Sequence, residues 1–89
     1  MIGEDVYTQS SQVFKNIESL LAVAGATMAD VIKINTFPTD MSQYGEFSRA
    51  RNEAFPAGVP ASASYSTPAL VLPSLLVEVE AIAIIGSGS

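Results

Sequence analysis

The sequence predicts an α+β domain in which two helices pack on one face of a β-sheet. Three observations support this fold class. Two segments have helical periodicity, three segments are β-branched or strictly alternating, and their order is helix, strand, helix, strand, strand. The 89 residues are enough for one domain, which we place at residues 1–85. Residues 86–89 form a Gly/Ser tail that we expect to be flexible.

The first helix is predicted from Asp5 onward, because apolar residues recur there at helical spacing with polar residues between them. Gly25 stands where a helix commonly ends, since glycine adopts a left-handed backbone conformation without steric cost. The pattern indicates an amphipathic helix of roughly five turns. Its apolar residues are Val6, Val13, Ile17, Leu20, Leu21 and Ala24.

The segment 31–37 predicts a strand, because it is rich in β-branched residues and is followed by Pro38. We take the alternating residues Ile32, Ile34 and Thr36 as the face that points to the core. This choice leaves the other face of the strand for solvent or for a partner.

Asp40 is a typical N-cap residue, so a second helix is predicted at about residues 41–54. Arg49 and Arg51 lie in this helix. We interpret both as solvated arginines or as arginines with buried stems, and ligand binding as the less favoured alternative.

Two further strands follow a loop at residues 55–60. The segment 61–67 alternates serines with other residues, which predicts a strand with one face of hydroxyl groups. The closing strand is predicted at residues 72–85, and one of its faces is uniformly apolar. Its other face carries Glu78 and Glu80 in a hydrophobic segment, and these carboxylates need water or a partner.

One packed layer between the helices and the sheet is expected to hold the main core. Large apolar side chains from the first helix, the second helix and two strands would meet there. The expected members are Ile17, Leu20, Ile34, Phe47, Val77 and Val79.

The composition excludes several classes of function. The net charge of -5 and the lack of a basic cluster argue against electrostatic binding of nucleic acid. The chain has no histidine and no cysteine, which makes a zinc site or a hydrolase triad a poor expectation. With 48% hydrophobic residues in so short a chain, oligomerisation would hide apolar surface.

Three stretches resemble the RidA/YjgF family, also labelled endoribonuclease L-PSP. The stretch DVIKINTFPTDMSQYGEF is similar to the family's strand-to-helix segment, and VPASASYSTPALVLPSLLVEVEAIA is similar to its PARS strand and its closing LPGxLVEIEAIA strand. The stretch TQSSQVFKNIESLLAVAGATMADV matches the family's first helix and the turn after it. The resemblance covers nearly the whole chain.

The resemblance implies a chorismate-mutase-like or RidA-like fold and a homotrimer with ligand clefts between subunits. It also implies hydrolysis of imines or enamines, such as 2-iminobutanoate and 2-iminopropanoate, without a metal or an organic cofactor. Glu78 matches the closing glutamate that positions the attacking water or a proton. Ser48 falls on the position of a site-lining asparagine, and Ser62 falls on that of the carboxylate-binding arginine.

The chain departs from the family pattern in two places. Ser62 replaces the arginine, which counts against deaminase activity, and the family's N-terminal hairpin strands have no counterpart, so the fold is expected to be N-terminally shortened. A hydroxyl cannot replace a guanidinium as a bidentate anchor. Small carboxylates are therefore expected to bind weakly, unless another cation such as Lys33 or Arg51 anchors them.

Three functions stay open at this point. The first is an imine or enamine deaminase with Glu78 as the catalytic residue and Ser62 and Ser48 as substrate-binding residues. The second is a non-catalytic trimeric module with a binding or structural role. The weakest is an endoribonuclease or translation inhibitor, as the family label suggests. We expect a cytoplasmic protein with small acid or imine ligands and with neither membrane nor nucleic acid as a partner.

Overall fold

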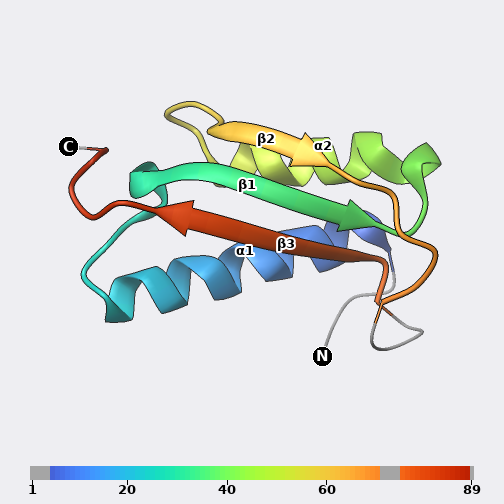
Figure 1. The fold of residues 1–89 in the computed structure, drawn as a ribbon, viewed down its shortest axis with the longest axis horizontal. Coiled ribbons are helices and arrows are strands. Elements are labelled where there is room, and N and C mark those ends of the chain that lie inside the picture. The colour runs from blue at the N-terminus through green and yellow to red at the C-terminus, as the bar shows by residue number, and fades with distance from the viewer. Residues whose placement is uncertain (1–4, 71–74, 89) are drawn as a thin grey trace.

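The computed structural model describes residues 5–70 and 75–88, in which two α-helices cover one face of a three-stranded sheet (Figure 1). This arrangement confirms the predicted α+β class. Short 3-10 turns, η1 and η2, precede β1 and α2. In chain order the elements are α1 (Val6–Val23), η1 (Met28–Asp30), β1 (Val31–Pro38), η2 (Met41–Gln43), α2 (Tyr44–Ala54), β2 (Ala61–Ser64) and β3 (Val77–Ala83).

The sheet has the strand order β2-β1-β3, so β1 is central. Strands β1 and β2 are parallel and α2 connects them, whereas β3 is antiparallel to β1. A parallel pair needs a crossover of this kind, because a tight turn cannot return the chain to the same end of the sheet. Both helices lie behind the sheet in Figure 1, and the face toward the viewer is here called the outer face.

The helix boundaries follow from local hydrogen bonds. Asp5 caps α1, and its Oδ1 accepts a hydrogen bond from the Thr8 backbone N–H at 2.7 Å. Gly25 follows the end of α1 with φ of +80°, as predicted for a glycine after a helix. Asp40 accepts from the Ser42 backbone N–H at 2.9 Å, but the first turn of this predicted helix is the 3-10 turn η2.

The core lies between the helices and the sheet and is rich in aromatic rings. Phe47 of α2 is fully buried, and its ring centroid lies 5.8 Å from that of Phe14 in α1. Phe14 also meets Phe55 edge to face. The predicted core residues Ile34, Phe47 and Val77 are buried, and Ile17 and Val79 pack against them.

The prediction that Leu20 lies in the core is wrong. Its side chain is 71% exposed, whereas the neighbouring Leu21 packs against the core. Successive side chains on a helix point about 100° apart, so two adjacent leucines cannot both face the sheet. The buried stripe instead runs through Phe14, Ile17 and Leu21, at helical spacings of three and four residues.

The strands also differ from the predictions, and β2 ends at Ser64 although a strand is predicted over residues 61–67. Ile32 is exposed and Val31 is buried, because the register between β1 and β3 shifts between Val31 and Lys33. The extra residue at such a bulge reverses which side chain faces the core. The closing strand is shorter than expected, since β3 begins at Val77 and ends at Ala83, and the predicted start at Leu72 lies outside the described residues.

Asp30 connects the start of β1 to the end of the chain. Its carboxylate accepts hydrogen bonds from the backbone N–H groups of Gly88 and Thr27, each at 3.0 Å. These hydrogen bonds, first that from Gly88, lower the pKa of Asp30 in the folded state. The predicted flexibility of residues 86–89 stays a prediction, but Gly88 has a defined partner in the structure.

The lowered pKa of Asp30 predicts a pH-dependent contribution to stability. Because the folded-state pKa lies below the unfolded value, the contribution is complete above the unfolded pKa and is lost as the pH falls through the folded pKa. We expect Asp30→Asn to lower the urea midpoint at neutral pH and the difference from the native chain to shrink as the pH falls through the folded-state pKa of Asp30. A difference that stays constant over this pH range would contradict the role of the Asp30 carboxylate.

Candidate functional site

The acid pair of β3 lies on the outer face of the sheet. Alternation along β3 turns Val77 and Val79 toward the helices, so Glu78 and Glu80 point the other way. In the antiparallel register Glu78 lies opposite Phe37 of β1. Both carboxylates are exposed, and neither forms a hydrogen bond or an ion pair with a residue that the structure describes. Water therefore solvates the pair in a single chain.

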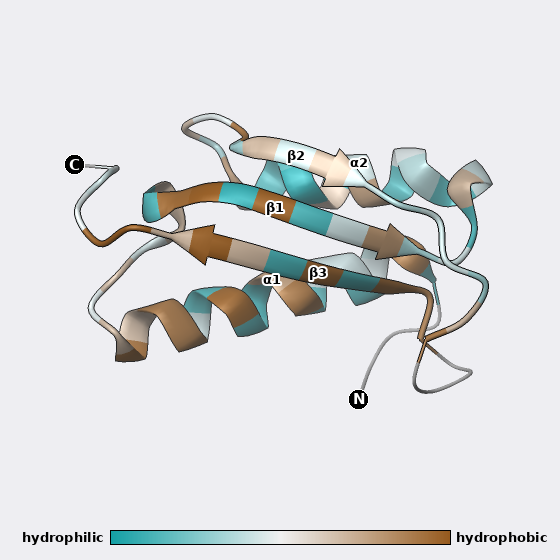
Figure 2. Ribbon diagram, in the orientation of Figure 1, coloured by the Kyte–Doolittle hydropathy of each residue, from teal (hydrophilic) through white to brown (hydrophobic). Residues whose placement is uncertain are grey.

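Aromatic and aliphatic side chains also lie on this outer face. Phe37, beside Glu78, stacks on Tyr65 with ring centroids 5.8 Å apart. Ile32 and Ile82 are 42% and 52% exposed. Figure 2 shows the underlying sequence pattern, in which hydrophobic and hydrophilic residues alternate along β1 and β3. The outer face thus combines two carboxylates and the exposed Lys33 cation, which lies opposite Ile82, with exposed apolar surface.

Ser62 lies on the opposite face of the sheet from Glu78. In the parallel register Ser62 lies beside Ile34, whose side chain is fully buried under the helices. Ser64, two residues further along β2, donates a hydrogen bond to the Tyr44 hydroxyl of α2 at 3.1 Å. Alternation places Ser62 and Ser64 on this same helix-facing side. Within one chain the structure therefore does not bring Ser62 and Glu78 together.

Ser48 belongs to a cluster of polar groups between α2 and β2. Its Oγ accepts a hydrogen bond from Nη2 of Arg51 at 2.9 Å, and Nη1 of Arg51 donates to the Tyr44 hydroxyl at 3.2 Å. We call the four residues Tyr44, Ser48, Arg51 and Ser64 the Arg51 cluster. Ser48 and Ser62 thus both belong to the α2–β2 side of the molecule.

Helical spacing in the sequence indicates part of this cluster. Tyr44, Ser48 and Arg51 are spaced by four and three residues, which places them on one stripe of a helix. The contact with Ser64 depends on how α2 lies against β2, and periodicity carries no information about that packing.

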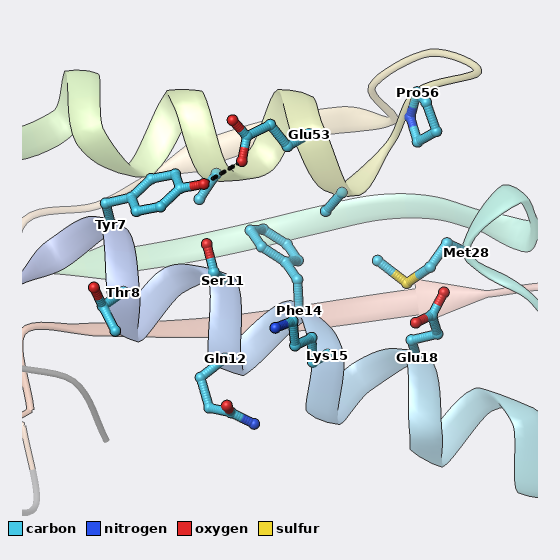
Figure 3. Close-up of a pocket in the computed structure, with 12 residues that line it drawn as sticks. Tyr7, Thr8, Ser11, Gln12, Phe14, Lys15, Glu18, Met28, Glu53 and Pro56 are labelled. Carbon is cyan, nitrogen blue, oxygen red and sulfur yellow. Dashed lines mark hydrogen bonds between the residues drawn. The ribbon is translucent and has the colours of Figure 1, made fainter. Parts of the chain in front are cut away.

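A groove of about 530 Å³ lies between α1 and α2, away from the predicted site residues (Figure 3). The Tyr7 hydroxyl of α1 donates to the Glu53 carboxylate of α2 across its rim. The guanidinium of Arg49 lies 3.6 Å from the centre of the Tyr7 ring. These contacts tie the two helices together and account for the polar residues at this end of the groove.

Among residues 5–70 and 75–88, no group of three or more acidic, histidine or cysteine side chains is arranged to hold a metal ion. Neither described helix is long and apolar enough to cross a membrane.

The fold defines a class of α+β proteins with two helices on one side of a mixed sheet and a free outer face. Residues 1–85 match the profile of the family described as Endoribonuclease L-PSP. The chain therefore belongs to this family, which is the RidA/YjgF family of the resemblance above. The shared fold is supported by a YjgF/YER057c/UK114 family structure from Mycobacterium tuberculosis, with a TM-score of 0.90 and 36% identity over 93% of this chain and 70% of that one.

Two curated relatives indicate how far the similarity extends. A RutC family protein of Pyrococcus horikoshii is 33% identical over 93% of this chain and 65% of its own length. A mouse protein named 2-iminobutanoate/2-iminopropanoate deaminase is 33% identical over 97% of this chain and 63% of its own length. The chain thus spans less than two thirds of the length of these relatives.

Proposed function

We propose that this chain is a subunit of a trimer that hydrolyses small 2-imino acids, or their enamine forms, at clefts between subunits. The observation that carries the proposal is the exposed Glu78 carboxylate on the outer face, which has no partner among residues 5–70 and 75–88 and stands at the position of the family's closing glutamate. The substrate class comes from the name of the mouse relative. A cytoplasmic setting stays the expectation from the sequence.

The proposed reaction needs little from the protein. Water adds to the C=N carbon, the nitrogen gains protons, and the C–N bond then breaks to give a 2-oxo acid and ammonia. A carboxylate such as Glu78 can orient the water and accept its proton, and then return a proton to the departing nitrogen. Neither a metal nor an organic cofactor enters this scheme.

The site requires two chains, because its expected parts lie on opposite faces of one sheet. Glu78 points outward, whereas Ser62 and Ser48 lie on the side of α2. A neighbouring subunit that packs on the outer face would bring its own α2–β2 side toward Glu78. The exposed Ile32, Ile82 and Tyr65 side chains favour such packing, since burying them removes apolar surface from water.

A non-catalytic trimeric module is the second candidate, and Ser62 in place of the family's arginine favours it. Endoribonuclease or translation-inhibitor activity follows from the family label alone. An RNA phosphate would meet the exposed carboxylates of Glu78 and Glu80 on the outer face, and like charges repel. We therefore rank RNA cleavage last.

Glu78→Gln tests the deaminase proposal. An amino-acid oxidase generates the imine in situ, and the release of the 2-oxo acid is measured against a blank without this protein. We expect the native chain to exceed the blank and Glu78→Gln to lose about 100-fold or more of that excess, because general acid–base groups typically contribute this much. Glu80→Gln is the matched control, since it removes the same charge from the same face.

In this assay the control Glu80→Gln is expected to keep most of the native rate. A native rate equal to the blank would favour the non-catalytic module. Equal losses in both variants would show that net negative charge on the face, and not the Glu78 carboxylate, supports the reaction.

A further inference from the structure

Arg51 is a cation whose described partners are all neutral. Its guanidinium donates to the Tyr44 hydroxyl at 3.2 Å and to the Ser48 hydroxyl at 2.9 Å. Its charged centre lies 5.9 Å from the centre of the Phe47 ring. By contrast, Arg49 forms an ion pair with Glu46 at 2.7 Å, and the described residues give Arg51 no such pair.

This difference between the two arginines of α2 matters because a guanidinium stays charged at any working pH. Arg49 is exposed and already neutralised by Glu46. Arg51 is half-buried, and hydroxyl groups leave its charge uncompensated. A charge held away from water is stabilised by an ion of opposite sign, so Arg51 is suited to an anionic ligand.

One edge of the Arg51 guanidinium is weakly occupied. Nε and Nη2 both point to the side-chain oxygen of Asn52, each at 3.4 Å, which is long for a hydrogen bond. These two nitrogens form the fork that binds a carboxylate through two parallel hydrogen bonds. Asn52 is exposed, so its amide can rotate away and a carboxylate can take its place.

The remaining groups of the Arg51 cluster hold the guanidinium in position. Tyr44 receives hydrogen bonds from both Arg51 and Ser64, so it connects α2 to β2. Ser62 lies on the same face as Ser64, toward the end of α2 that carries Arg51, because β2 and α2 run in opposite directions (Figure 1). The position that lacks the family's arginine therefore lies on the same side of the sheet as Arg51.

We infer that Arg51 anchors the carboxylate of the 2-imino or 2-oxo acid in place of an arginine at position 62. This inference rests on the proposed function, because that function supplies the ligand class. Tyr44 and Ser48 are positioning residues that orient the guanidinium. The chain thus keeps a carboxylate-binding fork but supplies it from the helix and not from the strand.

Titration calorimetry with 2-oxobutanoate, the product of 2-iminobutanoate hydrolysis, tests whether Arg51 binds the ligand's carboxylate. We expect measurable binding by the native chain and about 10- to 100-fold weaker binding by Arg51→Ala, since hydrogen bonds to a charged group are lost. Arg49→Ala is the matched control, because it removes the same charge from the same helix, and it is expected to bind as the native chain does. Circular dichroism verifies that each variant is folded.

A rescue variant separates ligand anchoring from a structural role. Adding Ser62→Arg to Arg51→Ala is expected to restore binding, because position 62 lies on the same face. Unchanged binding in Arg51→Ala, an equal loss in Arg49→Ala, or no recovery in a folded double variant would each overturn the inference.

The two proposals can fail separately. If the native chain hydrolyses the imine and Arg51→Ala does so equally well, the anchor is wrong and the deaminase proposal stands. If 2-oxobutanoate binds through Arg51 but the imine rate equals the blank, the deaminase proposal is wrong and the anchor stands.

Discussion

Replacing Phe47 by alanine is expected to lower the free energy of unfolding by about 3–5 kcal/mol, the usual cost of deleting a buried aromatic ring. Phe47 is fully buried where α2 meets α1 and the sheet. Its ring packs on those of Phe14, at 5.8 Å, and Tyr44, at 5.5 Å. Domains of this size are stable by about 5–15 kcal/mol, so the variant would be close to unfolding.

Urea denaturation followed by circular dichroism measures this effect, with Leu20→Ala as the control. Leu20 is 71% exposed on α1, and its replacement should change the free energy of unfolding by less than about 0.5 kcal/mol. A large loss in Leu20→Ala with little loss in Phe47→Ala would place the core on the other side of α1.

The sequence predicted both α-helices and all three strands of the described residues, because each has its own periodicity. The prediction of which side chains face the core was wrong in two places. One is the pair Leu20 and Leu21, of which only one can face the sheet, and the other is Ile32, where a bulge shifts the alternation. Both failures depend on tertiary packing. A helix with apolar residues on more than one stripe does not reveal which stripe meets the sheet.

The candidate site was only partly predictable for a related reason. The family resemblance indicated Glu78, Ser62 and Ser48 as site residues. It did not indicate that Glu78 lies on the outer face of the sheet, whereas Ser62 and Ser48 lie on the helix side. That separation follows from the register of β1 with its two neighbours. The hydrogen bonds that orient Arg51 toward Tyr44 and Ser48 required the structure as well.

In the proposed trimer, Glu78 of one chain and Arg51 of another build a single site. Two impaired variants test this arrangement when they are mixed, unfolded and refolded together. Chains with Glu78→Gln keep Arg51, and chains with Arg51→Ala keep Glu78. In a closed ring of three, every mixed trimer contains one interface with both native groups.

Each variant alone is expected to lose most of the rate in excess of the blank, and light scattering should give three chains per particle, as the proposed trimer requires. After random mixing in equal amounts, about a quarter of all sites would be native, so the mixture should recover about a quarter of the native rate. This recovery is the result that the shared site predicts. A mixture that forms trimers containing both variants and still reacts no faster than the blank would contradict it.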